Sequence, residues 1–154
     1  MHARYIFPSL ALVALLGGCA GTVALQPAEL ANDPGCADVM VRVPDAIGTN
    51  ARRTTNAQST AAWGDPTAII LRCGIPDSGP STLPCYTING IDWLRDDSKD
   101  PSFVFTTYGR NPATEVIVDS TKAGGTDALA AVGTAVGSIP ATAKCLDAED
   151  VFGN

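Results

Sequence analysis

The chain has 154 residues, enough for one domain of ordinary size built around one hydrophobic core. Its net charge of −6 at pH 7 predicts an acidic surface, which is a poor match for nucleic acid or for anionic lipid headgroups. The one histidine, His2, lies in a predicted targeting segment. The mature chain would therefore lack the imidazole that Ser-His-Asp, Cys-His and histidine-zinc catalysis require.

A short apolar run at residues 6–16 leads into the motif Leu16-Gly17-Gly18-Cys19. The run follows Arg4 and is shorter than the about 20 apolar residues that cross a bilayer. The motif is typical of bacterial lipoprotein processing, in which the cysteine becomes the first mature residue and carries diacylglyceryl and palmitate chains. The alternative is an ordinary secretion signal that is cleaved after Ala24.

The lipoprotein interpretation sets the expected domain organisation. Residues 1–18 would be the signal peptide, 19–33 the lipid anchor and tether, 34–145 a single α+β domain, and 146–154 an acidic tail. Two or more acyl chains hold a protein firmly to a membrane. We therefore expect an extracytoplasmic protein, anchored to the outer face of the cell membrane.

Four cysteines remain after the lipidated one, namely Cys36, Cys73, Cys85 and Cys145. An even number in an oxidising compartment predicts two disulfides, and the count alone leaves three connectivities open. No pair has the close spacing of a zinc knuckle, so we expect neither a metal nor another cofactor.

The first elements are predicted from caps and apolar spacing. Asp33-Pro34 is typical of a helix start, and apolar residues then recur with helical spacing as far as Val43, before Pro44. Residues 50–59 predict a strand and a turn, and residues 60–63 a short strand that ends at Gly64-Asp65-Pro66. Residues 68–71 are apolar on both faces, which predicts a central strand that is covered on both sides.

The strongest local signal is Asn89-Gly90, between residues 85–88 and 91–94. This dipeptide favours a two-residue hairpin, because both central positions need positive φ. The register then pairs Ile88 with Ile91 and Tyr86 with Trp93 on one buried face. Asp92 falls on the opposite, solvent-facing side.

Two more strands are predicted at residues 103–108 and 114–118. Thr126-Asp127 then predicts the cap of a helix whose apolar stripe reaches Ile139. Strands grouped between two helices favour an α+β fold. We expect a mostly antiparallel sheet of about six strands, with an N-terminal and a C-terminal helix on one face.

The chain resembles a family of small uncharacterised lipoproteins from high-GC Gram-positive bacteria, a family with a domain of unknown function. Four stretches carry the resemblance: Ala61-Ala62-Trp63-Gly64-Asp65-Pro66, Leu71-Arg72-Cys73-Gly74, Ile88-Asn89-Gly90-Ile91-Asp92-Trp93 and Phe105-Thr106-Thr107-Tyr108-Gly109-Arg110. The resemblance implies no catalytic residues. It implies a Cys36–Cys73 disulfide, which leaves Cys85 to pair with Cys145.

Paired carboxylates are the enzymatic chemistry that remains. Asp65 and Asp92 each lie close to a tryptophan in sequence, as is common where sugars bind. A glycosidase needs two carboxyl groups at a set separation. Against this, Asp65 fits a turn, and tryptophans such as Trp63 are more often core residues. Trp63, Asp65, Arg72 and Asp92 together form the candidate ligand-binding set.

These observations favour a non-catalytic binding or accessory module of the cell envelope, tethered to the membrane by its lipid. Its partner would be a cell-envelope protein or a glycan. A carboxylate-dependent glycan-acting enzyme is one alternative, and it requires Asp65 or Asp92 to share a cleft with another carboxylate. An assembly lipoprotein that acts through a protein partner is the other, and it requires an exposed apolar patch.

Overall fold

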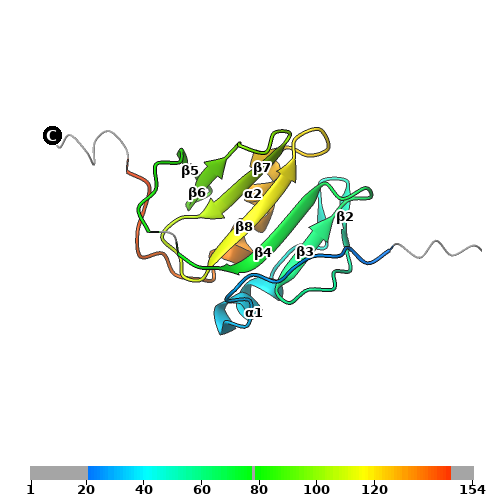
Figure 1. Ribbon diagram of the computed structural model, residues 1–154, viewed down its shortest axis with the longest axis horizontal. Coiled ribbons are helices and arrows are strands. Elements are labelled where there is room, and N and C mark those ends of the chain that lie inside the picture. The colour runs from blue at the N-terminus through cyan, green and yellow to red at the C-terminus, as the bar shows by residue number, and fades with distance from the viewer. Residues whose placement is uncertain (1–20, 78, 147–154) are drawn as a thin grey trace, which may run out of the picture.

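The computed structural model describes residues 21–77 and 79–146. In these residues one antiparallel sheet of eight strands is backed by two helices, with the strand order β1-β2-β3-β4-β8-β7-β6-β5 (Figure 1). The elements are α1 (Pro34–Met40), β1 (Ala46–Ile47), β2 (Asn50–Arg53), β3 (Thr60–Trp63), β4 (Ile69–Ile75), β5 (Cys85–Ile88), β6 (Ile91–Asp96), β7 (Ser102–Thr107), β8 (Ala113–Asp119) and α2 (Gly125–Val136).

The predicted α+β class with an antiparallel sheet is confirmed, but the described chain has more strands than expected. The expected number of about six was too low. β1 has only two residues, and the four residues of β2 are polar apart from Ala51. A two-residue edge strand such as β1 carries no apolar alternation that a sequence pattern could reveal, whereas β2 lies within the strand and turn predicted at residues 50–59. None of the helices in the described ranges is long and apolar enough to cross a bilayer.

Both helices pack on one face of the sheet, which we call the inner face. A disulfide joins Cys36 of α1 to Cys73 of β4, and Gly125 of α2 lies against the ring of Phe105 in β7. The sheet register places Cys73 and Phe105 on the same side. The fully buried side chains of this core include Trp63, Ile69, Leu71, Trp93, Val116, Val118, Leu129 and Val132.

The central strand β4 is covered on one side only, contrary to the expectation from its apolar sequence. Ile69 and Leu71 are fully buried on the inner face. Ile70 and Arg72 point to the opposite, outer face and are half-buried. The outer face carries a row of half-buried apolar residues, Ile70, Ile117 and Val104, that runs across three neighbouring strands.

The two helices begin differently. The start of α1 is as predicted, because the Asp33 side chain accepts a hydrogen bond from the N–H of Gly35 at 2.7 Å and Pro34 is the first helical residue. The predicted cap of α2 is wrong. Gly124 is the N-cap, with no side-chain hydrogen bond, and Thr126 and Asp127 lie inside the first turn.

The Asn89-Gly90 hairpin is confirmed. Both residues have positive φ, and β5 pairs with β6 in the predicted register, with Ile88 opposite Ile91 and Tyr86 opposite Trp93. One member of the predicted buried face differs, because Tyr86 keeps 47% of its surface exposed. Tyr86 lies on β5, the edge strand of the sheet, whereas Ile91 of the same hairpin lies under Gly133 and Gly137 of α2.

Residues 21–33, expected to form a tether, pack against the domain in the structure. Val23 forms a β-bridge with Thr55, and the N–H of Leu25 donates to Asn56 Oδ1 at 2.7 Å. The N–H of Leu30 donates to the carbonyl of Gly74 at 2.8 Å. The described chain is therefore bound to the sheet almost from its first residue.

Residues 139–145 form a second bound segment, which we call the C-terminal strap. The N–H of Thr142 donates to the carbonyl of Gly109 at 2.7 Å, and the Arg110 side chain donates to the carbonyl of Ile139. Burial lowers the pKa of Arg110, and the nearby Asp92 carboxylate opposes this shift. The Cys85–Cys145 disulfide fixes the end of the strap to β5.

Two glycines with positive φ offer a direct test of the strap. A Cβ at Gly109 would overlap the backbone of Ala143, whereas a Cβ at Gly90 would meet open space. We expect Gly90→Ala to lower the free energy of unfolding by about 1 kcal/mol through backbone strain alone. Gly109→Ala should cost at least twice as much, measured by urea unfolding, because the strap must also move. Equal losses would contradict the packing of the strap.

Candidate ligand pocket

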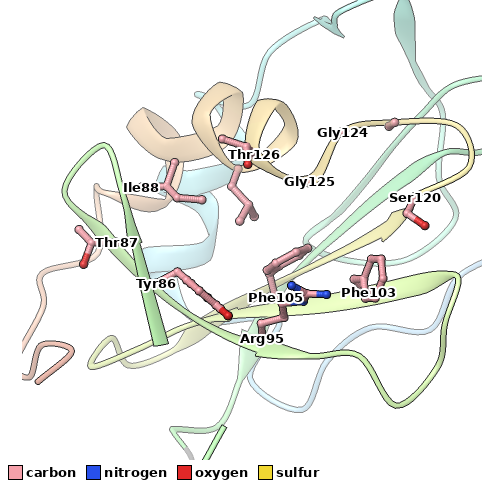
Figure 2. Close-up of a pocket in the computed structure, with 12 residues that line it drawn as sticks. Tyr86, Thr87, Ile88, Arg95, Phe103, Phe105, Ser120, Gly124, Gly125 and Thr126 are labelled. Atoms are coloured by element: carbon pink, nitrogen blue, oxygen red, sulfur yellow. The ribbon is translucent and has the colours of Figure 1, made fainter. Parts of the chain in front are cut away.

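A cavity of about 550 Å³ lies on the inner face between strands β5–β7 and the start of α2. This volume is within the range of small-molecule sites. Three aromatic side chains line it, namely Tyr86, Phe103 and Phe105, and Ile88 and Leu129 add aliphatic surface. Figure 2 shows the aromatic rings between the sheet and the turn that carries Gly124 and Gly125.

The pocket exists because α2 is too short to cover the whole inner face. The helix begins at Gly125, where an added Cβ would lie 3.2 Å from the Phe105 ring, so that the helix start rests directly on this ring. Beyond that point Arg95 of β6 and Phe103 of β7 are only half-buried, whereas Ile91, at the other end of β6, lies under Gly133 and Gly137 of α2. The uncovered end of the sheet is the floor of the cavity.

Arg95 supplies the only charged side chain among the lining residues. It is the Cα partner of Phe105 across β6 and β7, and its guanidinium carbon lies 4.6 Å from the centre of the Phe103 ring. Its Nη2 atom is 3.6 Å from Asp97 Oδ2, an ion pair at the exposed rim. Its Nε atom is buried and has no hydrogen-bond partner.

A turn after β8 forms one wall of the pocket and is held by Asp119. The Asp119 carboxylate accepts hydrogen bonds from the Lys122 ammonium and from the hydroxyl and N–H of Thr121. These bonds, that from Lys122 first, lower the pKa of Asp119 to about 2. The carboxylate therefore stays charged over the neutral and mildly acidic range, and the turn presents Ser120 and Ala123 to the cavity.

The lining of the pocket is suited to binding. It combines aromatic and aliphatic surface with one guanidinium and the hydroxyls of Ser120 and Thr126. None of its lining residues is an aspartate, glutamate, histidine or cysteine, so the pocket wall holds no carboxylate pair of the kind that glycosidases use. Within the described ranges, no group of three or more such residues could hold a metal ion.

The four residues of the predicted ligand-binding set do not meet in one site. Trp63 is fully buried on the inner face, where its indole N–H donates to the carbonyl of Pro44 at 3.0 Å. Asp65 lies in the turn after β3 and pairs with Arg53 at 3.1 Å. It borders a separate hollow that contains no second carboxylate.

The other two members lie on the outer face, on strands that β8 and β7 separate. Arg72 forms an ion pair with Glu115, its partner across β4 and β8, at 3.6 Å. Asp92 was expected to be a free surface residue, and this is wrong. Its carboxylate accepts hydrogen bonds from the Thr87 hydroxyl at 2.5 Å and from the N–H of Cys145 at 2.8 Å.

The cysteines form the pairs that the family resemblance implied. Cys36 is bonded to Cys73 and Cys85 to Cys145. The first bridge is fully buried and the second is half-buried. Cys19, the predicted lipidation site, lies outside the described residues.

Sequence motifs did not identify the residues that line the pocket, although the hairpin register contained a signal. Arg95 lies two positions after Trp93 in β6, so strand alternation places it on the buried face. A charged side chain at an inward position is unusual and indicates either an ion pair or a cavity. The position of the cavity itself depends on where α2 begins, and this was predicted incorrectly.

An antiparallel α+β domain with two disulfides and a small amphipathic pocket defines the class of this protein. Residues 18–144 match the family model described as Protein of unknown function (DUF3515). The chain belongs to this family. No curated protein and no solved structure matches the chain.

The corrected position of Asp92 gives a prediction about stability. In Asp92→Asn one side-chain oxygen must replace two charged acceptors, so we expect the free energy of unfolding to fall by about 1–2 kcal/mol. Asp65→Asn is the matched control, because Asp65 is 72% exposed and its loss should change stability by less than about 0.5 kcal/mol. Thermal and urea unfolding would compare the two variants. Equal effects would show that Asp92 does not hold the strap.

Proposed function

We propose that this protein is a non-catalytic binding module of the cell envelope, tethered to the outer face of the cell membrane through a lipid on Cys19. The pocket between β5–β7 and the start of α2 is its ligand site. The observation that carries the proposal is the composition of that pocket: aromatic and aliphatic walls around one guanidinium, with no acidic residue in the lining.

This composition selects a class of ligand. The rings of Tyr86 and Phe103 favour a flat or extended apolar body, and the Arg95 guanidinium favours a carboxylate, sulfate or phosphate group. The hydroxyls of Ser120 and Thr126 add polar groups to the lining. The proposed ligand is therefore a small amphipathic anion. The chain as a whole is acidic and would repel an anion over most of its surface, whereas the Arg95 guanidinium would attract it at the pocket.

The same geometry favours binding over the glycan-acting alternative. That alternative needs Asp65 or Asp92 to share a cleft with another carboxylate. Asp65 is paired with Arg53 at the β3 turn, and Asp92 is engaged by Thr87 and the strap. Neither carboxylate lines the pocket.

Binding can be tested with the probe 8-anilinonaphthalene-1-sulfonate, an aromatic sulfonate of the proposed class. We expect saturable binding to the folded protein, and Arg95→Gln should weaken it by roughly tenfold, because a charged hydrogen bond contributes about 1.5–3 kcal/mol. Arg42→Gln is the control, since Arg42 lies in the turn after α1, pairs with the exposed Asp38 and is not a lining residue. Fluorescence titration gives both constants. Equal affinity for the two variants would refute the assignment of the pocket.

Anchoring is tested separately. The motif Leu16-Gly17-Gly18-Cys19 supports lipidation of Cys19, as does the likeness to lipoproteins of high-GC Gram-positive bacteria. Cys19→Ser should release the protein into the medium or block its processing, and the mass of the N-terminal peptide should lose the diacylglyceryl and palmitate groups. If the variant fractionates with membranes as firmly as the wild type, with no change in mass, the lipoprotein assignment fails.

A further inference from the structure

We infer that the β1–β3 end of the sheet is the surface that contacts the membrane, with the ligand pocket opening at the opposite end. The inference rests on the proposed anchor at Cys19 and goes beyond it, because it fixes how the domain stands on the bilayer. It follows from how the chain beside the anchor is bound, from the side chains around that point, and from the strand order of the sheet.

The segment that follows the anchor is held by the domain. Arg53 Nη2 donates to the carbonyl of Gly21 at 2.7 Å, and the N–H of Val23 donates to the carbonyl of Thr54 at 2.9 Å. Cys19 precedes Gly21 by two residues, which span at most about 7 Å. A lipid on Cys19 would therefore bring the β2–β3 region against the headgroups, with no free linker between them.

The side chains at this end suit a phospholipid surface. Arg52 is exposed, and within the described residues its side chain has no hydrogen bond or ion pair. It lines two hollows of about 460 and 470 Å³, together with Thr49, Thr54 and other polar residues. A guanidinium in such a setting fits a phosphate group. Asp45 and Asp65 lie nearby, so the patch has little net charge and would not be held at the bilayer by charge attraction alone. The lipid anchor would instead keep the patch close to the headgroups.

The pocket lies at the other end of the sheet. From β2 the order runs through β3, β4, β8 and β7 to β6, and these five inter-strand steps amount to about 24 Å. Figure 1 shows the described chain starting beyond β2 and β3, on the side away from β5 and β6. The pocket would then open toward the cell envelope, and its ligand would be a soluble amphipathic anion and not a lipid within the bilayer.

The chain carries its own reporters for this orientation, because its only two tryptophans are Trp63 in β3 and Trp93 in β6. The mature chain, with its four other cysteines in disulfides, can be coupled through Cys19 to a maleimide lipid in vesicles that contain dansyl-labelled headgroups. Trp93→Phe leaves Trp63 as the sole donor, and Trp63→Phe leaves Trp93. Since β6 lies four strand steps, or about 19 Å, beyond β3, we expect energy transfer to the dansyl headgroups to be at least severalfold greater from Trp63.

A second measurement does not depend on core substitutions. Ten Gly-Ser residues inserted after Ala20 leave the Gly21 contacts intact and add a flexible linker with a root-mean-square length of about 18 Å between the anchor and the domain. In the otherwise wild-type chain this insertion should lower the total transfer severalfold. Equal transfer from Trp63 and Trp93, or no effect of the insertion, would overturn the orientation. If the orientation holds in coupled vesicles but native Cys19 carries no lipid by mass spectrometry, the proposed anchoring alone fails.

Discussion

The buried disulfide between Cys36 and Cys73 is the constraint on which the rest of the structure depends. It joins α1, a helix of seven residues, to the central strand β4. A helix of this length has little stability of its own in water. Closing a loop of 37 residues stabilises the fold by about 4 kcal/mol in the chain-entropy model. With α1 fixed, the inner face beneath it is covered, and α2 is left to cover the remainder.

The pocket follows from the limit of that coverage. The twelve residues of α2 start on the Phe105 ring, cover Ile91 of β6, and leave Arg95 and Phe103 on the inner face only half-buried. Aromatic rings and Arg95 occupy the positions that core residues would fill in a fully covered sheet. The second disulfide and the C-terminal strap hold β5 and the hairpin in place from the other side. The tightly bound start of the chain would hold the sheet itself in a fixed orientation on the membrane.

Local signals in the sequence predicted local structure well. Asn89-Gly90 gave the hairpin and its register, and Asp33-Pro34 gave the start of α1, because each depends on conformational preferences of two adjacent residues. The candidate site was not predictable in this way. Asp92 looked free because its partners, Thr87 and Cys145, are set by the hairpin and by a segment 53 residues away. The pocket depends on the length of α2, whose start at Gly125 has no side-chain cap to mark it.

The most direct test of the pocket as a ligand site is an NMR titration of the folded protein with 8-anilinonaphthalene-1-sulfonate, recorded on backbone amides and on the arginine Nε–H groups. If the pocket is the ligand site, chemical shift changes concentrate at the Arg95 Nε–H and at the amides of Ile88, Phe103, Gly124 and Gly125, which line it. Signals from Ile70 and Arg72 on the outer face should stay in place. Shifts centred on the outer face, or no saturable shift at Arg95, would contradict this assignment.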